Sequence, residues 1–87
     1  MFYVYVLRSL VNDKYYIGYT KDINLRLRRH NNGDVRSTRK FRPWMLLGSE
    51  LFEKRNEARW REHELKNHGM KRKIFIKNLE ESIKERV

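Results

Sequence analysis

Five side chains in this sequence could together cleave a phosphodiester bond: Tyr5, Tyr16, Arg26, His30 and Glu62. A phenol or an imidazole can move a proton, a guanidinium can hold a phosphate through two parallel hydrogen bonds, and a carboxylate can bind a hard cation. Arg26 follows Tyr16 by ten residues, and His30 comes one helical turn later. These residue types in a small basic chain suggest hydrolysis of a nucleic acid backbone.

The charge balance indicates an anionic partner. The chain carries 21 lysine and arginine residues against 11 aspartate and glutamate residues, a formal net charge of +10. Such an excess attracts polyanions from a distance, and nucleic acid is the usual polyanion for a small basic domain. A solvated surface or an anionic membrane surface is the alternative interpretation.

Length and composition exclude several classes of protein. With 87 residues and no cysteine, the chain is expected to form one domain over residues 1–87, without disulfides, thiolate zinc sites or a cysteine nucleophile. The apolar run of residues 1–7 is too short to span a bilayer, and Arg8 ends it. We therefore expect a cytoplasmic protein that does not bind a membrane.

The first part of the chain predicts a hairpin followed by a helix. Residues 2–9 and 15–20 are rich in aromatic and β-branched residues and predict two antiparallel strands joined by a short turn. Thr20 or Asp22 can cap the next helix, which is expected to extend to about residue 31. Gly33 then supplies a stop signal.

The second part predicts a strand and two helices. Residues 34–43 form a basic loop, and residues 44–52 predict a third strand. One helix is expected from an N-cap at Asn56, or from a little earlier, to about residue 67, and another from about Lys71 to Arg86. The order is ββαβαα, which predicts an α/β fold of the α+β type, a three-stranded antiparallel sheet flanked by three helices.

Arg26 and His30 are neighbours on the first helix, because they lie four residues apart. Ile23 and Leu27 are expected to point into the core, which leaves Arg26 beside the core and near the hairpin. The alternative is a solvated basic helix, since further arginines lie close by.

Glu62 stands on a stripe that is otherwise apolar. Ala58, Glu62 and Leu65 have the spacing of one helix face, and a carboxylate there costs free energy unless it is paired or binds a metal. A structural ion pair with a nearby arginine is the alternative. Glu57 and Glu64 fall on other faces and are expected to be exposed.

The aromatic residues could serve packing as well as catalysis or base stacking. Tyr5 and Tyr16 lie on adjacent strands, and tyrosine pairs across a hairpin more often pack than react. Gly18 either permits a close approach or marks a strand bend. Trp44 and Trp60 are expected to pack, with base stacking as the alternative.

Taken together, these motifs resemble the GIY-YIG nuclease family over nearly the whole chain. Val4-Tyr5-Val6 keeps the tyrosine of the first motif but lacks its glycine and isoleucine, and Tyr16-Ile17-Gly18 matches the second outright. Arg26 and His30 follow at the family's spacing, and Glu57-Ala58-Arg59-Trp60-Arg61-Glu62 is similar to the helix segment that ends in its glutamate. The chain looks most like the small stand-alone bacterial members.

The resemblance implies a GIY-YIG fold and a metal-dependent endonuclease that acts on DNA in repair or recombination, with RNA not excluded. One Mg²⁺ or Mn²⁺ ion would be held by Glu62. Tyr5 would be the general base and Arg26 would bind the phosphate, while Tyr16 and His30 would orient the reacting groups. Gly18 would be a structural residue of the second motif.

Nucleic acid is expected to contact the basic residues of the first helix and the following loop: Arg29, Arg36, Arg39, Lys40 and Arg42. So small a domain buries too little surface for tight sequence-specific binding, so shape, a homodimer or a partner protein would supply selectivity. The alternatives are a nucleic-acid-binding module of the same fold with weak or no catalysis, and a protein-interaction domain whose charge serves solubility.

Overall fold

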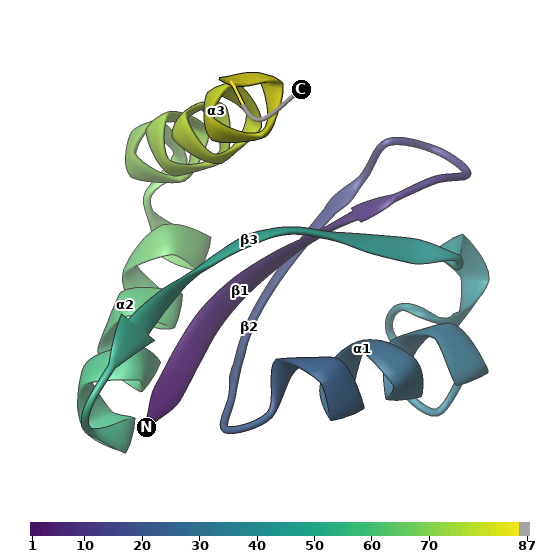
Figure 1. Cartoon of the computed structure of the whole chain (residues 1–87), viewed down its shortest axis with the longest axis horizontal. Coiled ribbons are helices and arrows are strands. Elements are labelled where there is room, and N and C mark those ends of the chain that lie inside the picture. Colours follow the sequence, from purple (N-terminus) through teal and green to yellow (C-terminus); the bar gives the residue numbers. More distant parts are fainter. Residues whose placement is uncertain (86–87) are drawn as a thin grey trace.

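The computed structural model describes residues 1–85, whose elements follow the predicted order ββαβαα (Figure 1). The elements are β1 (Phe2–Ser9), β2 (Tyr15–Thr20), α1 (Ile23–Asn32), a 3₁₀ turn (Arg39–Phe41), β3 (Trp44–Phe52), α2 (Arg55–Asn67) and α3 (Gly69–Glu85). The predicted fold class is confirmed. Within residues 1–85, no helix is both long and apolar enough to cross a bilayer.

The sheet has the strand order β2-β1-β3, and both pairings are antiparallel. The central strand β1 is covered on both faces, which explains why Val4, Tyr5, Val6 and Leu7 are all buried. In the pairing with β2, Tyr5 lies directly opposite Gly18. This register determines which residues the Tyr5 ring can approach.

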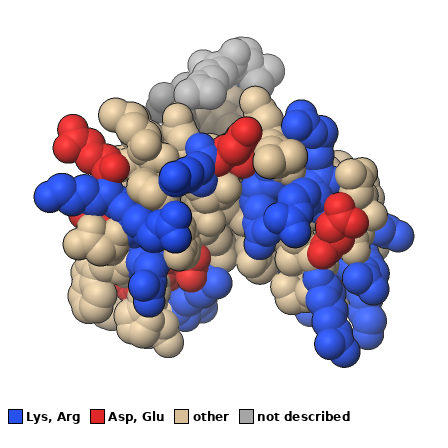
Figure 2. Space-filling model, turned by 90° about the horizontal axis from the view of Figure 1, so that it is seen from below, with Lys and Arg blue, Asp and Glu red and all other residues tan. Residues whose placement is uncertain are grey.

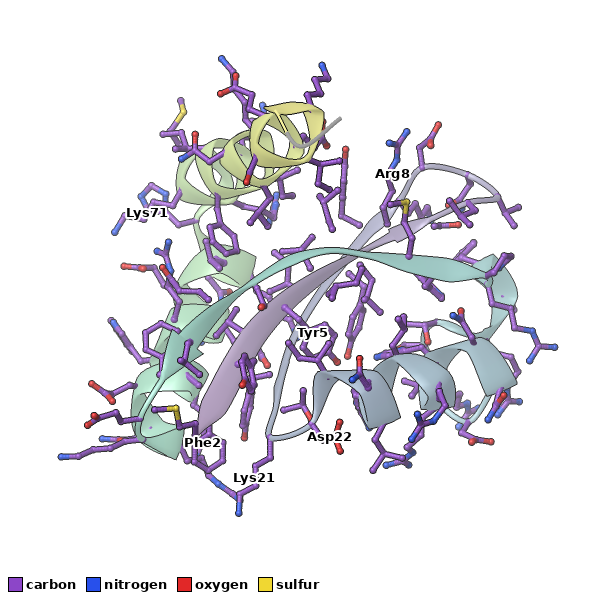
Figure 3. All side chains as sticks on the ribbon, in the orientation of Figure 1. Phe2, Tyr5, Arg8, Lys21, Asp22 and Lys71 are labelled. Carbon is purple, nitrogen blue, oxygen red and sulfur yellow. The ribbon has the colours of Figure 1, made fainter. Side chains whose placement is uncertain are left out.

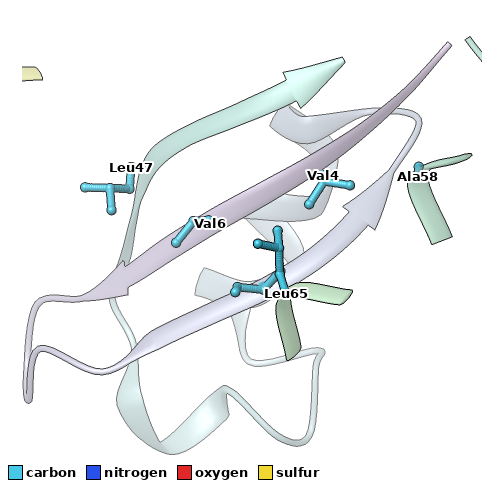
Figure 4. Close-up of a cluster of buried hydrophobic side chains, with 6 residues drawn as sticks. Val4, Val6, Leu47, Ala58 and Leu65 are labelled. Atoms are coloured by element: carbon cyan, nitrogen blue, oxygen red, sulfur yellow. The ribbon is translucent and has the colours of Figure 1, made fainter. Parts of the chain in front are cut away.

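Each face of the sheet packs against its own helices. One core lies under α2 and α3 and is built on Val4, Val6, Ile17, Leu47, Ala58 and Leu65 (Figure 4). The opposite core lies under α1 and is built on Tyr5, Leu7 and Trp44, with Ile23 and Leu27 packed against it as predicted. Because successive strand residues point to opposite faces, β1 contributes to both cores.

Helix α1 has well-defined ends. The Asp22 carboxylate accepts a hydrogen bond from the Leu25 backbone N–H at 3.0 Å, so Asp22 rather than Thr20 is the N-cap. Gly33 closes the helix in the left-handed region, with φ of 84°. The stop signal is confirmed, and the helix extends one residue beyond the expected end.

The other two helices begin slightly before Asn56 and Lys71. α2 starts at Arg55, within the earlier start that was allowed for, but its N-cap is Lys54, so the expected N-cap at Asn56 is wrong; the Lys54 backbone N–H donates to Glu57 Oε1 at 3.1 Å. α3 starts at Gly69 rather than Lys71, because His68 alone interrupts the helical backbone. The predicted end of α3 at Arg86 lies outside the described residues.

Replacing Leu65 by alanine should destabilise the fold by about 2–5 kcal/mol, since the side chain is fully buried between α2 and the sheet. Leu25→Ala on α1 is the matched control; that side chain is about half exposed and should cost under about 1 kcal/mol. Urea unfolding monitored by circular dichroism measures both changes. Equal losses for the two variants would contradict this assignment of the core.

Candidate active site

The phenol of Tyr5 is the point at which the predicted site residues meet. Tyr5 Oη lies 3.1 Å from His30 Nε2 and 3.4 Å from Arg26 Nε, so β1 contacts two residues of α1 at one oxygen. Figure 3 shows Tyr5 between the sheet and α1. The Tyr16 ring is 6.3 Å from the Tyr5 ring and lies edge-on to His30 at 4.9 Å. β1, β2 and α1 together position these four side chains.

Gly18 allows the Tyr5 ring to lie across strand β2. A Cβ atom at Gly18 would stand only 2.6 Å from Tyr5 Oη and 2.8 Å from Tyr5 Cζ, closer than real Cβ contacts come. Gly18 therefore permits a close approach by the Tyr5 ring, which was one of the two roles expected for it. The glycine of the second motif makes room for the tyrosine of the first.

The hydrogen bonds around His30 indicate where its proton lies. Thr38 Oγ1 lies 2.7 Å from His30 Nδ1 and 3.3 Å from the Val35 carbonyl oxygen. A proton on His30 Nδ1 satisfies both contacts, because Oγ1 then accepts from Nδ1 and donates its own proton to Val35. His30 Nε2 then carries a lone pair and accepts the Tyr5 hydroxyl proton. The Tyr5 oxygen in turn accepts from Arg26.

Burial controls the charge of both groups in this hydrogen bond. Burial raises the pKa of Tyr5 to about 12; the hydrogen bond from Arg26 opposes this rise, while Tyr16 and the negative charge of Glu62 add to it. Burial also lowers the pKa of His30 to about 4, and the positive charges of Arg26 and Arg29 act in the same direction. At neutral pH the phenol is protonated and the imidazole is neutral.

The first helix is only partly a solvated basic surface. Arg28 and Arg29 are exposed, as that alternative requires. His30 is fully buried and Arg26 is half-buried against Tyr5, so the alternative is wrong for these two residues.

Glu62 lies on α2, the helix that covers the face of the sheet opposite α1. Its side chain is 21% exposed and pairs with Lys66 Nζ at 3.2 Å, rather than with an arginine. The same ammonium lies 5.5 Å from the centre of the Tyr16 ring. The charge of Glu62 makes the smallest of the contributions to the raised pKa of Tyr5.

Glu64 differs from its prediction. It is 23% exposed rather than fully solvated, and it accepts from Arg61 at 2.7 Å and from Lys71 at 2.8 Å. Arg61 also pairs with Glu50 at 2.8 Å. Arg61, which precedes Glu62 in the sequence, thus pairs with other carboxylates. Glu57 is exposed as predicted.

The donor set at Glu62 fits a hard divalent cation only in combination with a substrate. Glu62 lines a pocket of about 510 Å³ that is wide enough for an ion with its waters. Among residues 1–85 no group of three or more histidine, aspartate or glutamate side chains could hold a metal. Mg²⁺ commonly uses one or two carboxylates plus substrate phosphate oxygens and waters, and Glu62 meets that requirement.

Exposed basic side chains lie on α1 and on the loop that follows it. Figure 2 shows a hollow between two lobes, with lysine and arginine on both of them. The residues expected to contact nucleic acid are all exposed: Arg29, Arg36, Arg39, Lys40 and Arg42. The Arg39 side chain also donates to the Gly33 carbonyl at 2.8 Å, which ties the basic loop to the end of α1.

Two residues of the site were not found from the sequence. Lys66 follows Glu62 by four residues on the same helix, a spacing at which opposite charges pair; that signal was available. Thr38 is buried beneath His30 from a loop eight residues away, and no sequence pattern marks it.

Comparison with known proteins shows the family and the fold of the chain. Residues 1–84 match the family model described as the GIY-YIG catalytic domain. A UPF0213 protein of Staphylococcus saprophyticus is 36% identical over 75 residues, 85% of this chain and 90% of that protein; one from Staphylococcus aureus is 34% identical over the same shares. The solution NMR structure of a UPF0213 protein from Bacillus halodurans is similar, with a TM-score of 0.55 and 31% identity, covering 91% of this chain and 85% of that one.

The buried His30 predicts a specific pH dependence of stability. Its folded pKa of about 4 lies below the ordinary value of 6.5, so the unfolded chain binds the proton more readily. Stability should be lost as the pH falls from about 6.5 to about 4, by up to about 1.4 kcal/mol per pH unit and about 3 kcal/mol in all. His30→Gln should remove this contribution from the pH profile of urea unfolding.

His63→Gln is the control for that measurement, because His63 lies on the exposed face of α2. This variant should keep the slope of the wild-type profile. A His30→Gln profile parallel to the wild type would show that the imidazole is not held neutral by its surroundings.

Gly18→Ala should displace the Tyr5 phenol from His30, since the added methyl group would overlap its oxygen. The Tyr5 ring is buried and cannot simply swing away, so we expect a loss of about 1–3 kcal/mol in the free energy of unfolding. Gly69→Ala is the matched control; its Cβ would come no closer than 3.8 Å to the nearest side chain. A lower melting temperature for Gly69→Ala than for Gly18→Ala would overturn the proposed contact.

Proposed function

Because the chain belongs to the GIY-YIG family of nucleases, we propose that it is a divalent-metal-dependent endonuclease that hydrolyses phosphodiester bonds in DNA. The observation that carries the proposal is the environment of Tyr5 Oη, held between the donor Arg26 and the acceptor His30 Nε2. A phenol with a donor on one side and an acceptor on the other can pass a proton on.

In the proposed reaction, the water oxygen bonds to phosphorus while its proton moves to Tyr5 Oη. The original phenol proton moves at the same time to His30 Nε2, which becomes an imidazolium. The bond from phosphorus to the leaving oxygen breaks, and that oxygen takes a proton from solvent. This relay suits a phenol whose pKa is about 12, because Tyr5 never has to exist as a free phenolate.

Phosphate binding would make His30 a better proton acceptor. The positive charges of Arg26 and Arg29 contribute to the lowered pKa of His30. A phosphate held by the Arg26 guanidinium would offset that positive field and stabilise a charged imidazole. Arg26 would also stabilise the negative charge that develops on the phosphate oxygens.

Glu62 would hold the Mg²⁺ or Mn²⁺ ion in the pocket beside β2. The ion, when bound, would neutralise charge on the scissile phosphate and the leaving oxygen. Tyr16 would orient the imidazole, since its ring packs edge-on against His30.

The exposed basic residues of α1 and the following loop would follow the DNA backbone from phosphate to phosphate. A domain of this size would select its substrate by shape, or through a second copy or a partner protein. By analogy with the family, we place the activity in DNA repair or recombination in the cytoplasm.

One observation favours a second candidate, a nucleic-acid-binding module of the same fold without useful catalysis. The Lys66 ammonium lies against Glu62 Oε1 and would compete with a metal for that carboxylate. Such a module would still bind DNA with steep salt dependence.

Cleavage assays with flapped, branched and plain duplex DNA separate the two candidates. With Mg²⁺ or Mn²⁺ present, Tyr5→Phe, Arg26→Ala and Glu62→Gln should each reduce the cleavage rate by about 100-fold or more, because each removes a proton-transfer, phosphate or metal contact. EDTA should abolish cleavage by the wild type.

Glu81→Gln makes the same change of charge on the exposed surface of α3 and should leave the rate unchanged. Binding without cleavage of any substrate by the wild type would reject the nuclease in favour of the binding module. Cleavage that survives Glu62→Gln would reject the assigned metal ligand.

A further inference from the structure

The exposed face of α2 beside Glu62 carries an aromatic pair that the proposed reaction does not use. Trp60 was expected to pack, but its side chain is 66% exposed, whereas Trp44 is buried as predicted. The Trp60 ring stacks on His63 with 5.8 Å between ring centres and 30° between planes. A large aromatic surface is thus held open to solvent by a neighbour on the same helix.

The His63 ring is itself held in place. The Asn67 side-chain amide donates to the His63 carbonyl oxygen at 2.8 Å and lies 3.2 Å from His63 Nδ1. Because an amide nitrogen can only donate, Nδ1 accepts, and the Nε2–H of a neutral imidazole points elsewhere. Trp60 therefore stacks on a ring whose orientation is set by the hydrogen bond from Asn67 to His63 Nδ1.

Trp60 and His63 line the same pocket as Glu62, with Arg59 and Tyr19 also in its wall. A volume of about 510 Å³ is in the range of small-ligand sites. An open aromatic face, a guanidinium and a carboxylate suited to a cation are together complementary to a nucleotide. The net charge of +10 favours an anionic occupant in the same way.

We propose that Trp60 stacks on an unpaired nucleobase of the DNA whose backbone is cut at Glu62. Bases within an intact duplex already stack on one another and offer no free face, whereas single-stranded bases stack readily on aromatic side chains. The substrate class is then DNA with a single-stranded segment at the cleavage point, such as a flap or a fork. This inference rests on the proposed nuclease function, because it places the base beside the metal-binding carboxylate.

The test measures binding in EDTA, so that no cleavage is needed. Affinity is determined for a thymidine oligonucleotide, a flapped duplex and a blunt duplex. Trp60→Ala should weaken binding of the first two by about 5- to 150-fold, the range for loss of one stacked base, with the blunt duplex changed less than about twofold. Trp60→Phe should restore most of the affinity.

Ile74→Ala is the matched control, since it removes another exposed apolar side chain on α3 and should change none of the three affinities. Tryptophan fluorescence gives a second readout, because Trp44 is buried and only Trp60 is accessible. The thymidine oligonucleotide should quench the wild type and should not quench Trp60→Ala.

Equal weakening of all three ligands by Trp60→Ala, or no weakening of any, would overturn the stacking role. If the wild type cleaves DNA and Trp60→Ala keeps the wild-type ratio of flapped to blunt cleavage, the inference fails while the nuclease stands. If selective binding and quenching are found without cleavage, the nuclease proposal fails and the base-stacking surface remains.

Discussion

The position of the Tyr5 phenol across Gly18 is the constraint on which the site depends. β1 is the central strand, and the side chains of its middle, from Val4 to Leu7, are covered on both faces. A ring from such a strand can extend over its neighbour only where the neighbour has no side chain, and Gly18 provides that position. The phenol then meets Arg26 and His30 of α1.

The basic character of the chain and the neutrality of His30 are connected. A buried imidazole avoids charge because desolvation disfavours the ionised form, and the arginines of α1 add to this effect. The same arginines would be partly neutralised by a bound phosphate. The positive surface would therefore do more than attract an anion, since occupying it would change the proton affinity of a group that is fully buried.

The sequence predicted the elements with local signals and missed contacts that depend on tertiary packing. The three strands and the ends of α1 were predictable because aromatic and β-branched runs, Asp22 and Gly33 act locally. The burial of Glu64 was not, since one of its partners, Lys71, is contributed by α3 across the helix junction.

The candidate site shows the same division between local and tertiary signals. The spacing of Arg26 and His30 indicated that they share a helix face, and Glu62 was identified by its place on an apolar stripe. Thr38 could not be predicted, because a loop brings it under His30 and no local pattern marks it. Trp60 was expected to pack because large aromatic residues usually do, and only the packing of α2 against the sheet decides that this side of the helix faces solvent.

The two neighbouring glutamates of α2 differ in how readily they could change partners. Glu64 is held by Arg61 and Lys71, and Arg61 is bound in turn by Glu50, so removing Glu64 would disturb a network. Glu62 has one ion pair, with a half-exposed lysine one turn away. Such a pair contributes about 0–1 kcal/mol, so a divalent cation held by Glu62 could replace it. The displaced Lys66 ammonium would remain beside Tyr16, where the incoming phosphate offers it a new anionic partner.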